Sequence, residues 1–456
     1  MIQFGTDGWR GLIADDFTFE NVRLVARALA CYVQKHENPA AGVVVGHDTR
    51  FGGERFAGTV AEELARAGIP TLVAGVPTPT PAVSYAVRHF RAAGAVMITA
   101  SHNPWQWSGV KFKAAYGGSA SPAIVKKIEA EVGQAFLPVQ TPASISETDF
   151  RTPYLEHLRR LVNLEAIARS GRRFVVDPLY GAGIGYVTAL LKAEEIHAYR
   201  DPLFPGLNQE PIEPHISELR RTVVEGRYDA GFALDGDADR LGAIDRTGDF
   251  VDSHRIFSIL LEHRARRGER GEVAKTFSTT KMVDRIAARY GMPCHETPIG
   301  FKYICDLMLE RDILMGGEES GGIGVRGHLP ERDGILNCLL LAEVMAERNL
   351  TLGELVAELH AQYGPQHYDR RDLHLAEGQK ERAIELFTRR PPARIAGLAV
   401  TATENKDGIK FLFGDTAWVL LRASGTEPLL RIYSEAPTLE QVEALLNEVE
   451  SLVRSS

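Results

Sequence analysis

Residues 95–104 read AVMITASHNP, an apolar run followed directly by a short polar loop. The four apolar residues at 95–98 predict a buried strand, and Ser101 follows its carboxyl end. Ligands of open α/β sheets bind beyond the carboxyl ends of the strands, so we expect Ser101 to lie exposed at a sheet edge, within reach of a ligand. His102 and Asn103 place a titratable ring and an amide beside the hydroxyl. The loop is a candidate nucleophile or phosphate carrier, although Ser, Asn and Pro are also common in ordinary turns.

Strands and helices alternate around this loop. Residues 42–46 (GVVVG) predict a strand, 54–67 a helix and 71–74 the next strand. Such alternation is typical of βαβ units with a mainly parallel sheet. The same rhythm restarts at residues 173–176 and 230–234, each an apolar run that leads into an acidic loop.

Interruptions in this alternation of strands and helices divide the chain into four predicted domains. Residues 138–153 lack periodicity and contain several Pro, Ser and Thr residues, which indicates a linker. Tyr363-Gly364-Pro365 breaks the chain again; the strands beyond it are close-set, with Asp407-Gly408 as a hairpin turn. We therefore expect three related α/β domains with mixed, mainly parallel sheets, and a smaller α+β C-terminal domain with an antiparallel sheet. The predicted boundaries are 1–150, 151–250, 251–364 and 365–456.

The composition restricts the partners and the compartment. The chain has 456 residues, a net charge of −8 and a pI of about 6.0, so neither nucleic acid nor an anionic membrane is an expected partner. No segment approaches the ~20 apolar residues of a membrane span, and we expect no signal peptide. The four cysteines are scattered without CxxC spacing, as buried free thiols in a reducing compartment would be. We expect a cytoplasmic protein that is a monomer or a homodimer.

Three aspartates form a candidate metal site. Asp235, Asp237 and Asp239 follow the apolar run 230–234 at alternate positions, which point to one side in an extended segment. Carboxylates that converge in this way repel one another unless a cation joins them. Hard oxygen ligands favour Mg²⁺, which keeps further positions for water and phosphate oxygens. The alternatives are a solvated acidic turn and the aspartyl nucleophile of a haloacid-dehalogenase-type phosphatase.

Two further loops carry groups suited to a sugar phosphate. Residues 316–322 (GGEESGG) place Glu318 among glycines, and a carboxylate can accept hydrogen bonds from two vicinal hydroxyls. Residues 422–428 (RASGTEP) combine an arginine fork for phosphate with hydroxyls and close backbone N–H groups. Taken alone, the first is better explained as a glycine-rich turn, and the second equally well as a surface loop.

Isolated cations lie near these loops in the sequence. Arg10 belongs to the segment 5–11 (GTDGWRG), Lys111 stands ten residues after Ser101, and Lys302 follows a turn at 297–300. Each of them, by itself, is more often a solvated surface residue.

Taken in order, these loops resemble those of the α-D-phosphohexomutase family, which comprises phosphoglucomutases, phosphomannomutases and phosphoglucosamine mutases. The resemblance covers essentially the whole chain. It implies four domains around a central cleft and the interconversion of hexose 1-phosphate and hexose 6-phosphate through a hexose 1,6-bisphosphate. The matching segments are the phosphoserine loop at 99–104, the metal loop at 235–240, the sugar-recognition loop at 317–321, the phosphate-binding loop at 422–426 and the amino-terminal motif at 5–11.

The resemblance also implies roles for individual residues. Ser101 would be phosphorylated, and Mg²⁺ would be held by it together with Asp235, Asp237 and Asp239. Lys111 would be the general acid/base, assisted by Arg10 and His102, with a pKa lowered by nearby cations. Hexose 1,6-bisphosphate would be the activator and intermediate. The residues expected to bind the sugar phosphate are Arg240, Lys302, Glu318, Ser320, Arg422, Ser424, Gly425, Thr426 and Arg431.

The sugar loop bears on the substrate. Glu319 and Gly322 stand where phosphoglucosamine mutases usually have Gln and His, and the pair Glu-Ser also occurs in phosphoglucomutases. This similarity favours glucose, with mannose next and a phosphoglucosamine mutase as the alternative. Ser108 and Ala423 depart from the family pattern and put one contact near Lys111 and one in the phosphate loop in doubt. The alternatives from other classes are a non-catalytic sugar-phosphate sensor and a phosphohydrolase.

Overall fold

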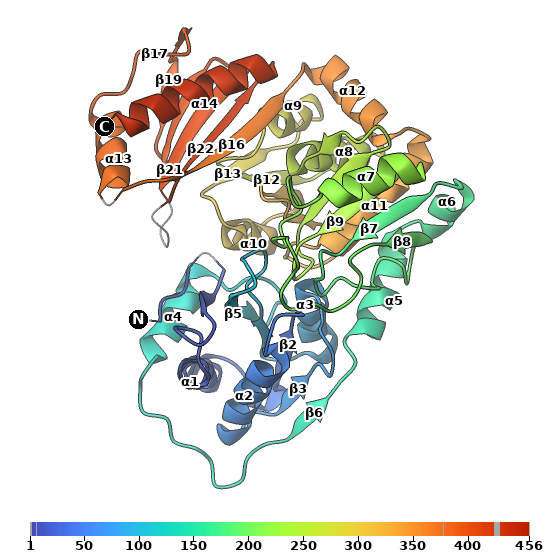
Figure 1. Ribbon diagram of the computed structural model, residues 1–456. Helices are drawn as coiled ribbons and strands as arrows, with labels where there is room; N and C mark the ends of the chain where they lie inside the picture. Colours follow the sequence, from blue (N-terminus) through green and yellow to red (C-terminus); the bar gives the residue numbers. More distant parts are fainter. Residues whose placement is uncertain (1, 6, 377, 424–428, 456) are drawn as a thin grey trace.

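The computed structural model describes residues 2–5, 7–376, 378–423 and 429–455. The described residues form four β-sheets that follow one another along the chain, each covered by helices (Figure 1), and a small sheet of β17 (Arg394–Ile395) and β18 (Leu398–Ala399). The predicted four-domain α/β architecture is confirmed. Within the described ranges, no helix has both the length and the apolar character needed to cross a membrane.

The first sheet carries the loop of Ser101. Its strands run parallel except for β5 (Trp107–Ala114), which pairs antiparallel with both of its neighbours near one edge. In order across the sheet, the strands are β1 (Trp9–Leu12), β5 (Trp107–Ala114), β4 (Gly94–Ile98), β2 (Val43–His47), β3 (Thr71–Val73) and β6 (Ile145–Glu147). The accompanying helices are α1 (Phe19–His36), the short 3₁₀ helix η1 (Pro39–Ala41), α2 (Gly53–Arg66), α3 (Thr80–Phe90) and α4 (Pro122–Glu131).

The segment 138–153, predicted to be a linker between domains, contains regular structure. Strand β6 lies within this segment and pairs parallel with β3 as the edge of the first sheet, and α5 begins at Arg151. All three residues of β6 are exposed, so the strand shows no apolar alternation by which the sequence would reveal it.

The second and third sheets repeat this plan of parallel strands with an antiparallel edge. Their apolar residues share one large core, in which α8 and α11 are largely buried. The second sheet has the order β11 (Phe250–Val251), β10 (Leu241–Asp245), β9 (Ala230–Leu234), β7 (Phe174–Asp177), β8 (Ala193–Glu195), with helices α5 (Arg151–Leu161), α6 (Leu164–Arg169) and α7 (Ser217–Gly226). The third has the order β13 (Cys294–Thr297), β12 (Glu272–Thr276), β14 (Ile313–Gly317), β15 (Ile323–Val325), with helices α8 (Ser253–Arg266), α9 (Lys281–Arg289), α10 (Phe301–Glu310), α11 (Gly334–Arg348) and α12 (Leu352–Tyr363).

The candidate loops occupy the same position in all three sheets. Each one leads from the carboxyl end of a parallel strand into the antiparallel strand beside it: β4 into β5, β9 into β10, and β14 into β15. Ser101, the three aspartates and Glu318 therefore all follow the carboxyl end of an apolar strand, where ligands of such sheets bind.

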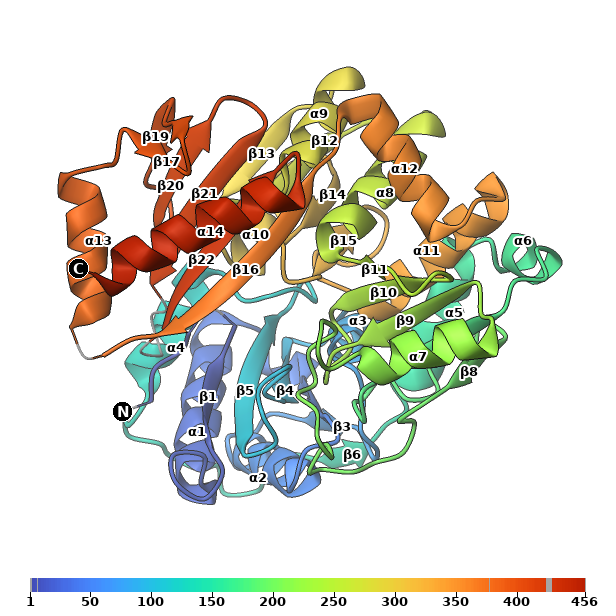
Figure 2. The same ribbon diagram turned by 45° about the horizontal axis from the view of Figure 1, so that its top comes forward.

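The fourth sheet is entirely antiparallel, as predicted. Helix α14 crosses one face of it (Figure 2) and contacts both β16 and β22. Strand β16 was not expected, because its sequence HYDRRDLH is polar and it lies at the edge of the sheet. The strands in order are β16 (His367–His374), β22 (Leu429–Ala436), β21 (Ala417–Ala423), β20 (Ile409–Phe413) and β19 (Ala402–Glu404), with helices α13 (Gln379–Arg389) and α14 (Leu439–Arg454).

The four cysteines all lie within the described ranges, and each is a free thiol, as expected. Cys305 and Cys338 are buried, as predicted, whereas Cys31 and Cys294 are only partly buried.

A buried ion pair joins the first sheet to the segment that precedes α11. The Lys113 ammonium lies 2.6 Å from a carboxylate oxygen of Glu331, and the Ser119 hydroxyl donates to the same oxygen at 2.7 Å. Both members of the ion pair are fully buried. Loss of Lys113 would leave the buried Glu331 carboxylate with only its longer ion pair to Arg332 Nε, at 3.6 Å.

We expect Lys113→Met to lower the free energy of unfolding by about 3–5 kcal/mol, because the buried Glu331 then loses its nearest counter-ion. The measurement is urea-induced unfolding followed by circular dichroism. The double variant Lys113→Met/Glu331→Gln removes both charges and should recover at least half of the loss. A single variant within about 1 kcal/mol of the wild type would contradict this account.

Candidate active site

Ser101 lies three residues beyond β4 in a left-handed backbone conformation, with φ at +52°. Its hydroxyl donates to Asp235 Oδ2 at 2.7 Å, and its amide donates to Thr99 Oγ1 at 2.9 Å. The expected position is therefore observed, but the expected exposure is not, because the side chain is fully buried. The cause is the loop after β9, which packs on Ser101 from the second sheet. Positive φ is uncommon for a residue with a Cβ and is concentrated at functional sites.

The three aspartates converge as the sequence predicts. Asp235, Asp237 and Asp239 are fully buried, and each offers one carboxylate oxygen within 4.8 Å of the others. Asp235 Oδ1 accepts the backbone N–H groups of Asp239 and Arg240, each at 3.0 Å. The Oδ1 atoms of Asp237 and Asp239 are buried and have no hydrogen-bond partner among the described residues. Hard oxygen donors with two such unsatisfied atoms fit a divalent cation such as Mg²⁺.

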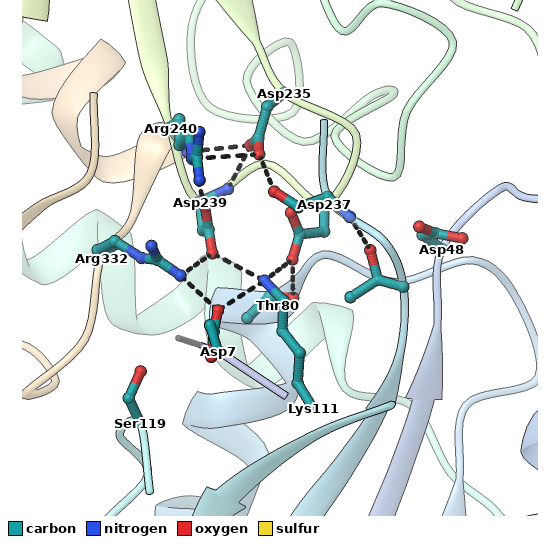
Figure 3. Close-up of polar contacts among 12 residues, drawn as sticks. Asp7, Asp48, Thr80, Lys111, Ser119, Asp235, Asp237, Asp239, Arg240 and Arg332 are labelled. Atoms are coloured by element: carbon teal, nitrogen blue, oxygen red, sulfur yellow. Dashed lines mark hydrogen bonds and ion pairs between the residues drawn. The ribbon is translucent and has the colours of Figure 1, made fainter. Parts of the chain in front are cut away.

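Cations from two other sheets compensate the aspartates (Figure 3). Lys111 Nζ, from β5, lies 2.8 Å from Asp237, 3.3 Å from Asp239 and 3.0 Å from Asp7. Arg332, from the segment before α11, lies 2.7 Å from both Asp7 and Asp239. Both cations are almost fully buried, so these ion pairs are shielded from solvent.

The pKa values in this cluster diverge. Burial, together with the charges of Asp239 and Asp237, raises the pKa of Asp235 well above its usual range. Burial also raises the pKa of Asp237, but the Lys111 ammonium, the Thr80 hydroxyl and Arg332 together outweigh burial, so that the pKa is lowered overall. The group beside Ser101 is thus more easily protonated than Asp237.

The expectation that neighbouring cations lower the pKa of Lys111 is wrong. Burial does lower this pKa, but the carboxylates of Asp237, Asp239 and Asp7 outweigh burial and raise it. The amine is therefore held protonated at neutral pH by its ion pairs.

The predicted residues Arg10, His102 and Arg240 lie around the same cluster. Arg10 Nη1 donates to Asn103 Oδ1 at 2.5 Å, and Arg240 Nε lies 3.8 Å from both Asp235 and Asp239. Burial, followed by the charges of Arg240 and Arg10, lowers the pKa of His102 well below its usual range. His102 is therefore neutral at pH 7, with a buried Nδ1 that has no hydrogen-bond partner in the described part of the chain.

Glu318 joins the site through Arg332. The Glu318 carboxylate accepts a hydrogen bond from Arg332 Nη1 at 3.2 Å, while its backbone N–H donates to Gly322. Burial raises the pKa of Glu318 to about 7, against the opposing charge of Arg332. Ser320 is half-buried on the same loop. Arg332 was missed from the sequence: it stands in a plain PERDG segment, and only its contacts with three carboxylates reveal it.

The remaining predicted residues bond elsewhere. The Lys302 ammonium lies over the ring of Tyr303, Arg422 pairs with Asp407 at 3.1 Å, and Arg431 lies 3.6 Å from Asp372. The fourth sheet still faces the serine loop, since Arg431 and Arg370 are among the cations that lower the pKa of His102. Ser424, Gly425 and Thr426 lie outside the described residues.

The site combines a serine hydroxyl, an acidic triad and surrounding lysine and arginine side chains. These groups are suited to the transfer of a phosphoryl group. Comparison with known proteins agrees. Four domain families described as phosphoglucomutase/phosphomannomutase match the chain: alpha/beta/alpha domain I at residues 1–137, domain II at 152–248, domain III at 252–363 and the C-terminal domain at 379–452.

Individual relatives match along their whole length. A phosphoglucomutase/phosphomannomutase of Thermococcus kodakarensis is 31% identical, with 97% of this chain and 96% of the relative covered. A phosphoglucosamine mutase of Carboxydothermus hydrogenoformans is also 31% identical, covering 99% and 98%. A crystal structure from Thermus thermophilus, assigned provisionally as a phosphomannomutase, is 37% identical with a TM-score of 0.89, covering 99% of both chains. The chain belongs to the phosphoglucomutase/phosphomannomutase family, and the prediction of a phosphohexomutase, an isomerase, is confirmed.

The close contact between the serine loop and the metal loop requires a glycine. A Cβ on Gly236 would lie 2.4 Å from the carbonyl oxygen of Ser101 and 2.3 Å from Gln209 Oε1. The contact with the Ser101 carbonyl is not tolerated, because that oxygen is a backbone atom, so any side chain here would separate the two loops.

We therefore expect Gly236→Ala to lower the kcat of the mutase at least about tenfold, since even a displacement of ~1 Å at a reacting group is costly. Gly58→Ala is the matched control: this glycine lies inside α2 with nothing within 4 Å of the added Cβ, and the variant should keep full activity. Equal activity of the two variants would show that the loops do not need this contact.

Proposed function

We propose that the chain interconverts hexose 1-phosphate and hexose 6-phosphate, with Ser101 as the carrier of the phosphoryl group. A hexose 1,6-bisphosphate would be the intermediate, and small sugar phosphates the only partners the reaction needs. The observation that carries this proposal is the 2.7 Å contact between Ser101 Oγ and Asp235, beside the other two aspartates and Lys111.

Mg²⁺ is the proposed cofactor, held by Asp235, Asp237 and Asp239 together with an oxygen of the phosphorylated Ser101. When bound, it would neutralise charge on the phosphoryl group as that group moves between oxygens. The two unsatisfied carboxylate oxygens of Asp237 and Asp239 support this assignment.

In the proposed transfer, a sugar hydroxyl oxygen forms a bond to the phosphorus on Ser101, and the bond from the phosphorus to Ser101 Oγ breaks. Lys111 handles the proton of that hydroxyl. The ion pairs of Lys111 favour its protonated form. In the return step, when the phosphoryl group moves back to Ser101, this ammonium donates a proton to the sugar oxygen. In the forward step the Lys111 amine must first lose its proton, against its ion pairs, to accept the proton of the sugar hydroxyl, and Ser101 Oγ gains a proton as the phosphoryl group leaves it. Arg10 and neutral His102 assist beside it.

The bisphosphate must then turn over so that its other phosphate reaches Ser101. Glu318 and Ser320 would bind O3 and O4 of the sugar in either orientation, while Arg240 and Lys302 would neutralise the reacting phosphate. We assign the four domains to residues 1–150, 151–250, 251–364 and 365–456. The fourth would anchor the non-reacting phosphate through Arg422, Ser424, Gly425, Thr426 and Arg431.

Glucose is the proposed sugar, with mannose second, on the basis of the pair Glu319-Ser320 in the sugar loop. Phosphoglucosamine mutase is the alternative, and the relatives of that name at 31% identity support it.

We expect Ser101→Ala to abolish turnover, with a loss of at least about 10⁴-fold in kcat, because no other group can carry the phosphoryl. Intact-mass analysis should find one phosphate on part of the wild-type protein, localised to Ser101, and none on the variant. Wild-type turnover by the variant would refute the role of Ser101.

Comparison of glucose, mannose, glucosamine and N-acetylglucosamine 1-phosphates, each with catalytic hexose 1,6-bisphosphate, tests the sugar assignment. Glucose 1-phosphate should have the highest kcat/KM. The highest value for glucosamine 1-phosphate would establish the alternative, and release of inorganic phosphate without isomer would indicate a phosphohydrolase.

A further inference from the structure

We propose that Arg50 is a positioning residue that shapes the Ser101 loop and holds it against the metal loop. This inference rests on the proposed role of Ser101 as phosphoryl carrier. Arg50 lies three residues after β2, and its side chain is fully buried. The sequence HDTR at 47–50 follows an apolar strand but matches none of the motifs that identified the site.

The guanidinium of Arg50 bonds to four backbone carbonyls, three in the serine loop and one at the first residue of β5. Its Nη2 donates to the carbonyl oxygens of Ser101 at 2.6 Å and Asn103 at 2.7 Å. Its Nη1 donates to those of Pro104 at 2.8 Å and Trp107 at 3.0 Å. A loop without regular structure needs partners for its buried carbonyls, and here one side chain supplies three of them.

The same side chain reaches the second domain. Arg50 Nη2 donates to Gln209 Oε1 at 3.1 Å, and the Gln209 amide donates in turn to the carbonyl of Leu179 at 3.0 Å. Phe204 lies over the guanidinium, 5.1 Å from its carbon to the ring centroid. Gln209 and the carbonyl of Ser101 also flank Gly236 of the metal loop. Arg50 therefore bonds to both atoms that lie closest to the Cα of Gly236 on the side where a Cβ would be, the Ser101 carbonyl oxygen and Gln209 Oε1.

The orientation of Arg50 is itself fixed. Asp48 Oδ2 accepts its Nε–H at 3.1 Å, and Asp48 Oδ1 accepts its backbone N–H at 2.9 Å. Burial lowers the pKa of Arg50, while Asp48 and Asp237 oppose that effect, and a guanidinium stays charged in any case. The planar fork satisfies several acceptors at once, which a lysine ammonium on a flexible stem cannot do.

In this arrangement, different residues bind the substrate and position Ser101. The sugar phosphate is expected to bind to groups on other loops, such as Glu318, whereas the direction of the Ser101 hydroxyl depends on its own backbone. Loss of the Arg50 fork should therefore slow transfer with little effect on substrate affinity. It should also let the phosphoserine shift, so that water competes with the sugar hydroxyl for the phosphoryl group.

The test is Arg50→Lys, which keeps the charge and removes the fork. We expect kcat to fall about 100-fold with KM within about twofold of wild type, since a ~1 Å displacement costs about that much. The ratio of inorganic phosphate released to isomer formed should rise. Arg200→Gln is the control: Arg200 donates to the backbone carbonyls of Thr49 and Arg50 and pairs with Glu54, so it contacts the same turn, but it bonds to no residue of the serine loop among the described contacts.

A kcat of Arg50→Lys within threefold of wild type would overturn the proposal, because charge alone would then suffice. Two other results would also overturn the proposal, because they would show that Arg50 has only a general structural role. One is an equal loss of kcat in Arg200→Gln. The other is a change of both kcat and KM in Arg50→Lys with an unaltered ratio of inorganic phosphate to isomer. If Arg50→Lys does not fold, Gln209→Met takes its place, with about a tenfold loss of kcat expected and an unchanged kcat contradicting us. An active Ser101→Ala enzyme would instead refute the underlying function, so the two failures are distinguishable.

Discussion

The buried aspartate triad is the constraint on which the rest of the site depends. Three carboxylates without solvent exposure repel one another and lose their hydration, so they require compensation from elsewhere in the chain. Lys111 supplies it from the first sheet and Arg332 from the segment before α11. Ion pairs therefore join the domains at this point, in addition to apolar packing. The same contact between domains places the Ser101 hydroxyl against Asp235.

A structural plan that is repeated in three sheets brings the functional loops to one site. In each of the first three sheets, the functional loop connects a parallel strand to the antiparallel strand beside it. Equivalent loops in three sheets can thus hold three different groups. In the proposed function, these are a phosphoryl carrier, a cation site and a carboxylate that binds sugar hydroxyls. Small residues allow the loops to approach, and Gly236, which has no room for a Cβ, is the clearest case.

The sequence predicted the parts of this site that depend on local order, and failed where they depend on contacts between domains. Ser101, the aspartates and Glu318 were found because each follows an apolar strand. The burial of Ser101 and the raised pKa of Lys111 were not, because both arise from groups more than 100 residues away. Polar edge strands such as β16 have no apolar alternation, and Arg332 lies in no recognisable motif.

The central claim is that the phosphoryl group travels through Ser101 into a bisphosphate, and the most direct measurement follows that group. Enzyme labelled with ³²P on the serine would be mixed with unlabelled glucose 1-phosphate and quenched within a single turnover. The account predicts that the label leaves the protein and appears first in glucose 1,6-bisphosphate, then in glucose 6-phosphate. Label that stays on the protein while product forms, or that leaves only as inorganic phosphate, would contradict it.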